Sequence, residues 1–282
     1  MSIWYSFCDL LCLDFLQWNF MKNAFLAIIL MAPLFGLCST MVVTGRMSFF
    51  SDALGHSAFT GIAIGAICGI GDPTWLSVVF AVFFAVLFSI VRNRGNQTAD
   101  TVIGVFSSTA VALGIFIATL GGESFTKFNR YLIGDILSIT PMQIGMLFFT
   151  LIVVVLFWIF CSNNLTLASI HPQLAATRGI NTAFIQGLFT VLIAVVVTLS
   201  ISWVGLLIIN SLLVLPGAAA RNVAKNMRQY HLVSILFAFV ASILGLLISY
   251  YWGTSAGASI SLILAPIYAV SLIVRKAGNT NG

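Results

Sequence analysis

The chain has 282 residues, of which 60% are hydrophobic and only 7% are charged. Soluble domains carry about a quarter charged residues, so this composition excludes a soluble globular protein. The net charge is +5, but the twelve Lys and Arg lie singly or in small groups between apolar runs, a distribution that argues against a nucleic-acid partner.

Nine apolar segments follow one another, each bounded by charged or turn-forming residues. A helix crosses a bilayer core about 30 Å thick with roughly 20 apolar residues. The segments therefore predict an all-α, polytopic protein with about nine transmembrane helices, or eight if the weak segment 204–220 does not cross. They cover residues 24–45, 48–70, 74–91, 101–120, 142–161, 182–201, 204–220, 231–252 and 255–274.

Basic residues between these segments predict the orientation of the chain. With the N-terminus outside, nine of the twelve Lys and Arg lie in cytoplasmic connections, as the positive-inside rule requires. Without segment 204–220 only four would be cytoplasmic. We therefore expect nine spans, an outer N-terminus and a cytoplasmic C-terminus.

The same pattern predicts the domain organisation. Residues 1–23 are expected to form an N-terminal interfacial segment, residues 24–276 a single transmembrane domain, and residues 277–282 a polar tail. Five cysteines are an odd number and predict no disulfide framework. Cys8 and Cys12, one helical turn apart, would bind a soft metal only with a further ligand, which is the less favoured interpretation.

The second apolar segment places Asp52 and His56 four residues apart, so both side chains project from one helix face. Gly61, Gly65 and Gly69 follow on the opposite face and predict close helix packing. Oxygen and nitrogen ligands suit Zn²⁺ or Mn²⁺, and two of them suit an ion that must also leave. The alternative, equally open from the residues alone, is that Asp52 caps the helix and His56 bonds to a neighbouring helix.

Two more acidic residues lie near predicted spans. Asp100 precedes the fourth segment and is interpreted as its N-cap rather than as part of a transport path. The outer connection, residues 121–141, mixes apolar and charged residues and suits an interfacial or re-entrant helix. Asp135 within it would either receive an ion on the outer side or pair with Arg130, and the residues favour neither.

A short helix is predicted in the inner connection, residues 162–179. Pro172 suits a first helical turn, Gly179 suits a C-terminal cap, and Arg178 suits the negative end of the helix dipole.

The seventh segment combines polar residues with a helix breaker. Because Pro216 follows Asn210 and Ser211, this helix is expected to be kinked or broken, and broken helices line substrate paths in transporters. Asn210, Ser211 and Pro216 are therefore candidates for lining a path, with ordinary helix packing as the equally open alternative.

No motif for nucleotide hydrolysis occurs. The chain lacks GxxxxGK[ST] and never contains the dipeptide Gly-Lys, and it also lacks HExxH, GxSxG and CxxC. We expect a protein that is not an enzyme and holds no resident cofactor, so that any ATP is used by a separate subunit.

Five segments together make the chain similar to the permease subunits of the bacterial zinc, manganese and iron ABC importers, the ABC-3 type. They occur in the order of that family and span nearly the whole chain. They are RMSFFSDALGHSAFTGIAIG (46–65), ADTVIGVFSS (99–108), YLIGDILSITP (131–141), IHPQLAATRGI (170–180) and VGLLIINSLLVLPGAAARNVAKN (204–226).

The resemblance implies a permease of the bacterial cytoplasmic membrane, surrounded by lipid and moving Zn²⁺, or Mn²⁺ or Fe²⁺, inward by alternating access. It implies three protein partners: a second copy of the chain, a cytoplasmic ATPase dimer that uses ATP, and an extracytoplasmic metal-binding protein. Asp52 and His56 match the family's second-helix motif, which places them on the metal path.

Residues 168–180 resemble the coupling helix that docks into the ATPase. The positions concerned are His171, Pro172, Gln173, Leu174, Ala175, Arg178 and Gly179. The chain departs from the family at Gln173, where an acidic residue is common, and at Ala258, where proline is frequent. The first departure puts a charge pairing with the ATPase in doubt.

Two other classes of protein are open alternatives. A secondary carrier without an ATPase often shows a two-fold internal repeat, which is not found here. An intramembrane enzyme would need a third partner beside Asp52 and His56.

Overall fold

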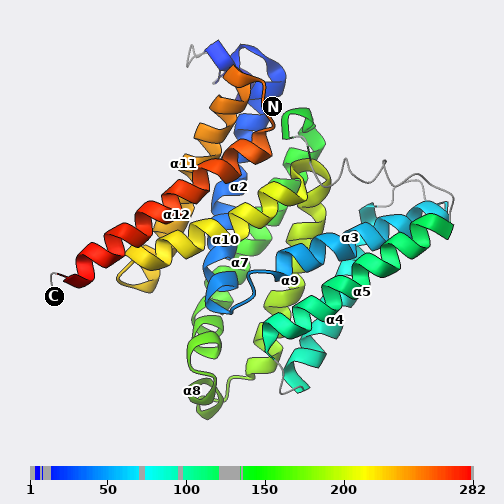
Figure 1. Ribbon diagram of the computed structural model, residues 1–282, viewed down its shortest axis with the longest axis vertical. Helices are drawn as coiled ribbons and strands as arrows, with labels where there is room; N and C mark the ends of the chain where they lie inside the picture. The colour runs from blue at the N-terminus through cyan, green and yellow to red at the C-terminus, as the bar shows by residue number, and fades with distance from the viewer. Residues whose placement is uncertain are drawn as a thin grey trace. The chain divides into compact units, whose positions relative to one another are not determined.

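The computed structural model describes residues 4–6, 8, 14–69, 74–94, 98–120, 134 and 136–280 (Figure 1). Within these residues every regular element is a helix, so the all-α prediction is confirmed. The elements are η1 (Asp14–Gln17), α2 (Asn19–Thr44), α3 (Phe50–Ile67), α4 (Thr74–Arg94), α5 (Ala99–Leu120), η2 (Ile136–Ser138), α7 (Pro141–Ile170), α8 (Pro172–Thr177), α9 (Thr182–Val204), α10 (Leu206–Val223), α11 (Met227–Trp252) and α12 (Ala256–Thr280).

Each of the nine predicted apolar segments coincides with a long helix. Eight helices in the described part of the chain are long and apolar enough to cross a membrane, which confirms a multi-pass membrane protein. The remaining long helix, α3, has 18 residues and carries Asp52 and His56. Its crossing of the membrane, and with it the outer N-terminus and cytoplasmic C-terminus, stay predictions.

Helix α7 is longer than the segment 142–161 predicted. It continues to Ile170 because its last turns are packed on one side. Leu165 and Ala168 are buried, and the Gln186 side chain of α9 donates a hydrogen bond to the Ala168 carbonyl at 3.0 Å. Polar residues in this stretch are therefore compatible with helix, and only the remainder of the inner connection forms the separate helix α8.

The N-cap of α5 also differs from the prediction. Asp100 lies inside the first turn, and the side-chain oxygen of Thr98 accepts a bond from the Thr101 amide at 3.4 Å. Thr98 thus has the capping role assigned to Asp100, whose carboxylate still lies at the positive end of the helix dipole.

By packing, the chain divides into two compact units, each made of several stretches of sequence. Unit 1 comprises Met1–Thr40, Gly134–Val155 and Trp203–Gly282, and unit 2 comprises Met41–Ile133 and Leu156–Ser202.

In unit 1, α10, α11 and α12 pack together, and short hydrogen bonds join them to α2. The Ser234 hydroxyl of α11 donates to the Gly36 carbonyl at 2.7 Å, and the Gly217 amide of α10 donates to the Ser39 hydroxyl at 2.8 Å. These polar groups are satisfied between helices, as buried groups in an apolar protein must be.

The N-terminal residues of unit 1 pack on the first turn of α2. The Trp4 indole donates to the Lys22 carbonyl at 2.9 Å, and the Tyr5 hydroxyl donates to the Asn23 side chain at 2.9 Å. Cys8 is buried, whereas Cys12 lies outside the described residues. The interfacial location of residues 1–23 stays a prediction.

In unit 2, α3 packs against both α4 and α5 (Figure 1). A Cβ on Gly61 would lie 2.5 Å from the Ser77 Cα of α4, so this glycine permits the close packing predicted for the glycine row. Gly69 has no such role among the described residues: it follows α3 with a φ of 68°, and no described atom lies within 4 Å of its Cβ position. On the α5 side, a Cβ on Gly114 would lie 2.7 Å from the Phe59 ring.

Gly61→Ala is expected to lower the free energy of unfolding by about 1–3 kcal/mol, because the added methyl group would push α4 away from α3. Gly104→Ala on α5 is the matched control, since no atom of the described residues lies within 4 Å of its Cβ position. The temperature at which the purified chain loses its monodisperse elution profile measures the effect. Equal temperatures for the two variants would contradict the close contact.

Candidate functional site

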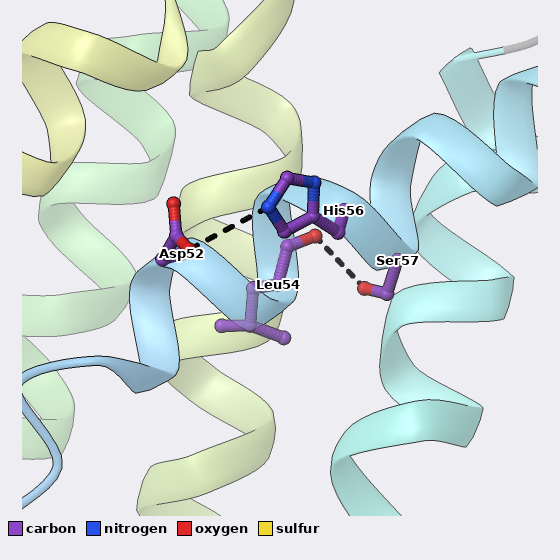
Figure 2. A network of polar contacts seen from close by, with 4 residues as sticks. All are labelled: Asp52, Leu54, His56 and Ser57. Atoms are coloured by element: carbon purple, nitrogen blue, oxygen red, sulfur yellow. Dashed lines mark hydrogen bonds and ion pairs between the residues drawn. The ribbon is translucent and has the colours of Figure 1, made fainter. Parts of the chain in front are cut away.

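Asp52 and His56 lie one turn apart near the start of α3, with the imidazole turned toward the carboxylate (Figure 2). The His56 Nε2 and Asp52 Oδ2 atoms are 3.5 Å apart. The two side chains are 31% and 48% exposed, so both remain accessible from outside the protein core. The structure therefore brings together the two residues predicted from their spacing.

The pair has the separation expected for two ligands of one metal ion. Ligand atoms about 2.1 Å from a tetrahedral Zn²⁺ ion lie about 3.4 Å from each other. The observed 3.5 Å separation is therefore suited to an ion bound by Nε2 and Oδ2 together. Such an ion would replace the direct contact between imidazole and carboxylate.

Two ligands are fewer than a resident metal site requires. Among the described residues no group of three or more His, Cys, Asp or Glu side chains could hold a metal ion. Asp135, predicted as a possible ion ligand, lies outside the described residues. The described residues therefore bring two possible ligand side chains together, Asp52 and His56.

The turn before α3 determines where the helix that carries Asp52 and His56 starts. Arg46 has a φ of 54°, an uncommon conformation for a residue with a side chain. The Arg92 guanidinium of α4 donates to the Gly45 carbonyl at 3.2 Å and contacts the Met47 sulfur at 3.1 Å. Arg92 thereby connects α4 to the turn from which α3 starts.

Helix α8 agrees with the short helix predicted in the inner connection; it follows α7 in the chain and lies at the lower end of that helix in Figure 1. Pro172 begins it, and Gly179 follows it with a φ of 75°. The Gly179 amide donates to the Ala176 carbonyl and the Ile180 amide to the Ala175 carbonyl, both at 3.0 Å. This pair of bonds is a Schellman motif, which ends helices at a glycine.

Most residues of α8 are exposed. Leu174 is 46% exposed and Ile170 is 48% exposed, whereas Ala175 is buried. His171, Gln173 and Arg178 are exposed as well. An open surface pocket of about 580 Å³ lies here, and its lining residues are Ile170, His171, Pro172, Gln173, Leu174 and Thr177.

The predicted break in the seventh span is not found within α10. The helix runs unbroken through Asn210 and Pro216, because a transmembrane helix tolerates proline where neighbouring helices pack against it. The interruption comes earlier, at Gly205, which has a φ of 87° and touches the backbone of Gly134. Ser211 lies 2.6 Å from the Ser261 hydroxyl of α12.

Reasoning from the sequence missed the residues that hold α3 in place. Thr60 continues the four-residue spacing of Asp52 and His56, and this spacing could have indicated that Thr60 belongs to the same side of the helix. Its hydroxyl donates to the Ala110 carbonyl of α5 at 2.7 Å. Arg92 was interpreted only as an indicator of membrane orientation, and nothing in the sequence indicates its contact with the turn before α3.

The chain matches the ABC 3 transport family over residues 17–275. It is 29% identical over 235 residues to the high-affinity zinc uptake system membrane protein ZnuB of Haemophilus influenzae, covering 83% of this chain and 90% of that protein. It is 28% identical over 262 residues to the manganese import system permease protein ScaB of Streptococcus gordonii, covering 92% of each chain.

Among solved structures, the chain is similar to PsaBC from Streptococcus pneumoniae, determined in complex with Fab. The sequence identity is 26%, the TM-score is 0.78, and the match covers 96% of this chain and 95% of the other. The shared architecture therefore extends over nearly the full length of both chains.

Arg92→Gln is expected to loosen the turn at residues 45–47, because a neutral, shorter side chain loses a charge-assisted hydrogen bond to Gly45. Amide hydrogen exchange of this turn should become about tenfold faster. Arg178→Gln, which alters an exposed arginine in the same unit, is the control and should leave the exchange unchanged. An unchanged exchange rate in Arg92→Gln would show that Arg92 does not hold this turn in place.

Proposed function

The chain belongs to the ABC 3 transport family, and we propose that it carries a divalent transition-metal ion inward as the membrane-spanning subunit of an ATP-driven importer. It is a permease subunit of the bacterial inner membrane without an ATPase site of its own. Zinc is the proposed cargo, with manganese or iron as the alternatives, since the relatives' names include both zinc and manganese systems.

The Asp52–His56 pair is the observation that carries this proposal. Ionisable side chains on an apolar helix are energetically unfavourable and usually face an internal path or a partner. Here they are half-exposed and stand at the separation of two metal ligands. The imidazole nitrogen favours zinc, while the small number of ligands lets the ion be released. Asn210, Ser211 and Pro216 are proposed as further path-lining residues.

Helix α8 is proposed as the coupling helix, and its surface supports a largely uncharged contact. Arg178 is the only Lys, Arg, Asp or Glu between Ser162 and Asn181. Gln173 would therefore offer hydrogen bonds without a charge. Leu174 and Ile170 are exposed and would enter an apolar groove of the ATPase.

The proposed assembly contains two copies of this chain, two cytoplasmic ATPase subunits and an extracytoplasmic metal-binding protein that delivers the ion. ATP binding by the ATPase pair would move the two α8 helices and so open the ion path alternately to each side. This scheme is supported by the full-length similarity to PsaBC and by the absence of a nucleotide-binding motif in this chain.

Asp52→Asn and His56→Ala are each expected to reduce ATP-dependent uptake of zinc and manganese by at least about tenfold, because the first replaces a carboxylate ligand by a weakly coordinating neutral amide and the second removes the imidazole. Uptake is measured with vesicles that hold the chain, its ATPase and its binding protein. Asp100→Asn is the matched control, since its exposed carboxylate lies at a helix start and not beside His56.

Normal uptake in both ligand variants would refute the assignment of the pair. Uptake that continues without the ATPase and follows an ion gradient would instead establish a secondary carrier.

Leu174→Asp is expected to weaken binding of the ATPase by at least about tenfold, because it places a charge where an apolar side chain is to be buried. Leu174→Met keeps the apolar character and should bind normally. The amount of ATPase that copurifies with the chain, and the stimulation of its ATP hydrolysis, report the effect. If both variants retain the ATPase equally, α8 is not the docking element.

A further inference from the structure

Thr60 lies one turn beyond His56 on the same stripe of α3. Each step of four residues turns about 40° around a helix, so the stripe rotates gradually from Asp52 to His56 and on to Thr60. Asp52 and His56 are partly exposed, whereas Thr60 is completely buried. The stripe thus begins at the candidate ion ligands and ends in the contact between α3 and α5.

The Thr60 hydroxyl joins the two helices at this point. It donates to the Ala110 carbonyl of α5 at 2.7 Å and is also 3.2 Å from the carbonyl of His56. One side chain therefore connects the backbone of the ligand-bearing residue to a neighbouring helix. In an apolar surrounding such a bond has little competition from water.

The sequence of α5 is adapted to this contact. Gly114 is one turn beyond Ala110, and a Cβ at this position would lie 2.8 Å from the Thr60 hydroxyl oxygen. A larger residue would separate the helices and lengthen the bond to Ala110. Ile62 and Ala118, both buried, extend the same contact with apolar packing.

We propose that Thr60, with Gly114 facing it, is a positioning residue that sets the location of the His56 imidazole for binding the transported ion. This inference rests on the proposed function of the Asp52–His56 pair. Helix α3 can slide or rotate on α5 only by breaking the Thr60–Ala110 bond. The bond therefore fixes the position of the His56 imidazole along α3 and the direction in which it points. A site with only two ligands binds a metal ion only if both ligands are held in the correct geometry.

The test compares metal uptake by complete complexes that contain Thr60→Val, Thr60→Ser or Gly114→Ala. Valine keeps the shape of threonine and removes the hydroxyl, serine keeps the hydroxyl, and alanine at 114 separates the helices while leaving Thr60 intact. Thr109→Val is the matched control, because the Thr109 hydroxyl is exposed and donates to the Val105 carbonyl of its own helix. Zinc and manganese are offered as free ions with the binding protein present.

Thr60→Val and Gly114→Ala are expected to raise the half-saturating metal concentration about fivefold, while the maximal rate per assembled complex changes by less than about twofold. Thr60→Ser and Thr109→Val should behave like the original chain. A purely structural role would instead reduce the quantity of assembled complex and leave the half-saturating concentration unchanged. That result, or equal behaviour of Thr60→Val and Thr109→Val, would overturn the proposal.

Two further comparisons complete the design. If Thr60→Val does not assemble, Gly114→Ala alone decides, because the hydroxyl is then still present and only the helix spacing has changed. Asp52→Asn in the same assay distinguishes the role of the Asp52–His56 pair from the role of Thr60. If Asp52→Asn leaves uptake unaffected, the proposed role of the Asp52–His56 pair fails; if it abolishes uptake while Thr60→Val and Gly114→Ala change nothing, only the positioning role of Thr60 fails.

Discussion

The close packing of α3 against α4 and α5 is the constraint on which the candidate site depends. A carboxylate and an imidazole reduce the apolar character of α3, which is not among the eight helices of the described residues that are long and apolar enough to cross a membrane. It is held instead by contacts within unit 2. Gly61 lies directly on α4, and Thr60 donates to a carbonyl of α5. Arg92 fixes the turn before α3. The helix that carries the polar pair is thus held by contacts with α4 and α5, which are distant from the pair in sequence.

Much of the fold was predictable because membrane spans are dictated by length and hydrophobicity. The predictions that were wrong concern the ends and interruptions of single helices. The final turns of α7 were predicted as a connection because Asn163 and Asn164 are polar, yet one side of the helix remains packed through Leu165 and Ala168. Pro216 suggested a broken helix, whereas the interruption falls at Gly205. Periodicity and composition report an average environment, and these outcomes depend on which neighbour lies against each turn.

The site was predictable to the extent that it is local. Asp52 and His56 meet because four residues make about one helical turn, and α8 begins and ends where proline and glycine place its boundaries. The supporting contacts could not be predicted in this way. Thr60 pairs with a carbonyl 50 residues away, and Arg92 reaches back 47 residues to Gly45. Such contacts require the packing of whole helices, which no short motif encodes.

The Asp52–His56 pair and α8 belong to the same compact unit, unit 2. This matters for how movement of α8 would reach the pair in the proposed importer. The end of α7 is bonded to α9 through Gln186, and Gly187 in the next position lies against Ser89 of α4. Helix α4 in turn lies against Gly61 of α3. A displacement of α8 would therefore reach Asp52 and His56 through packed helices rather than through flexible loops. If Asp52 and His56 are the two ligands, as proposed, a small change in their relative position would be enough to alter ion binding.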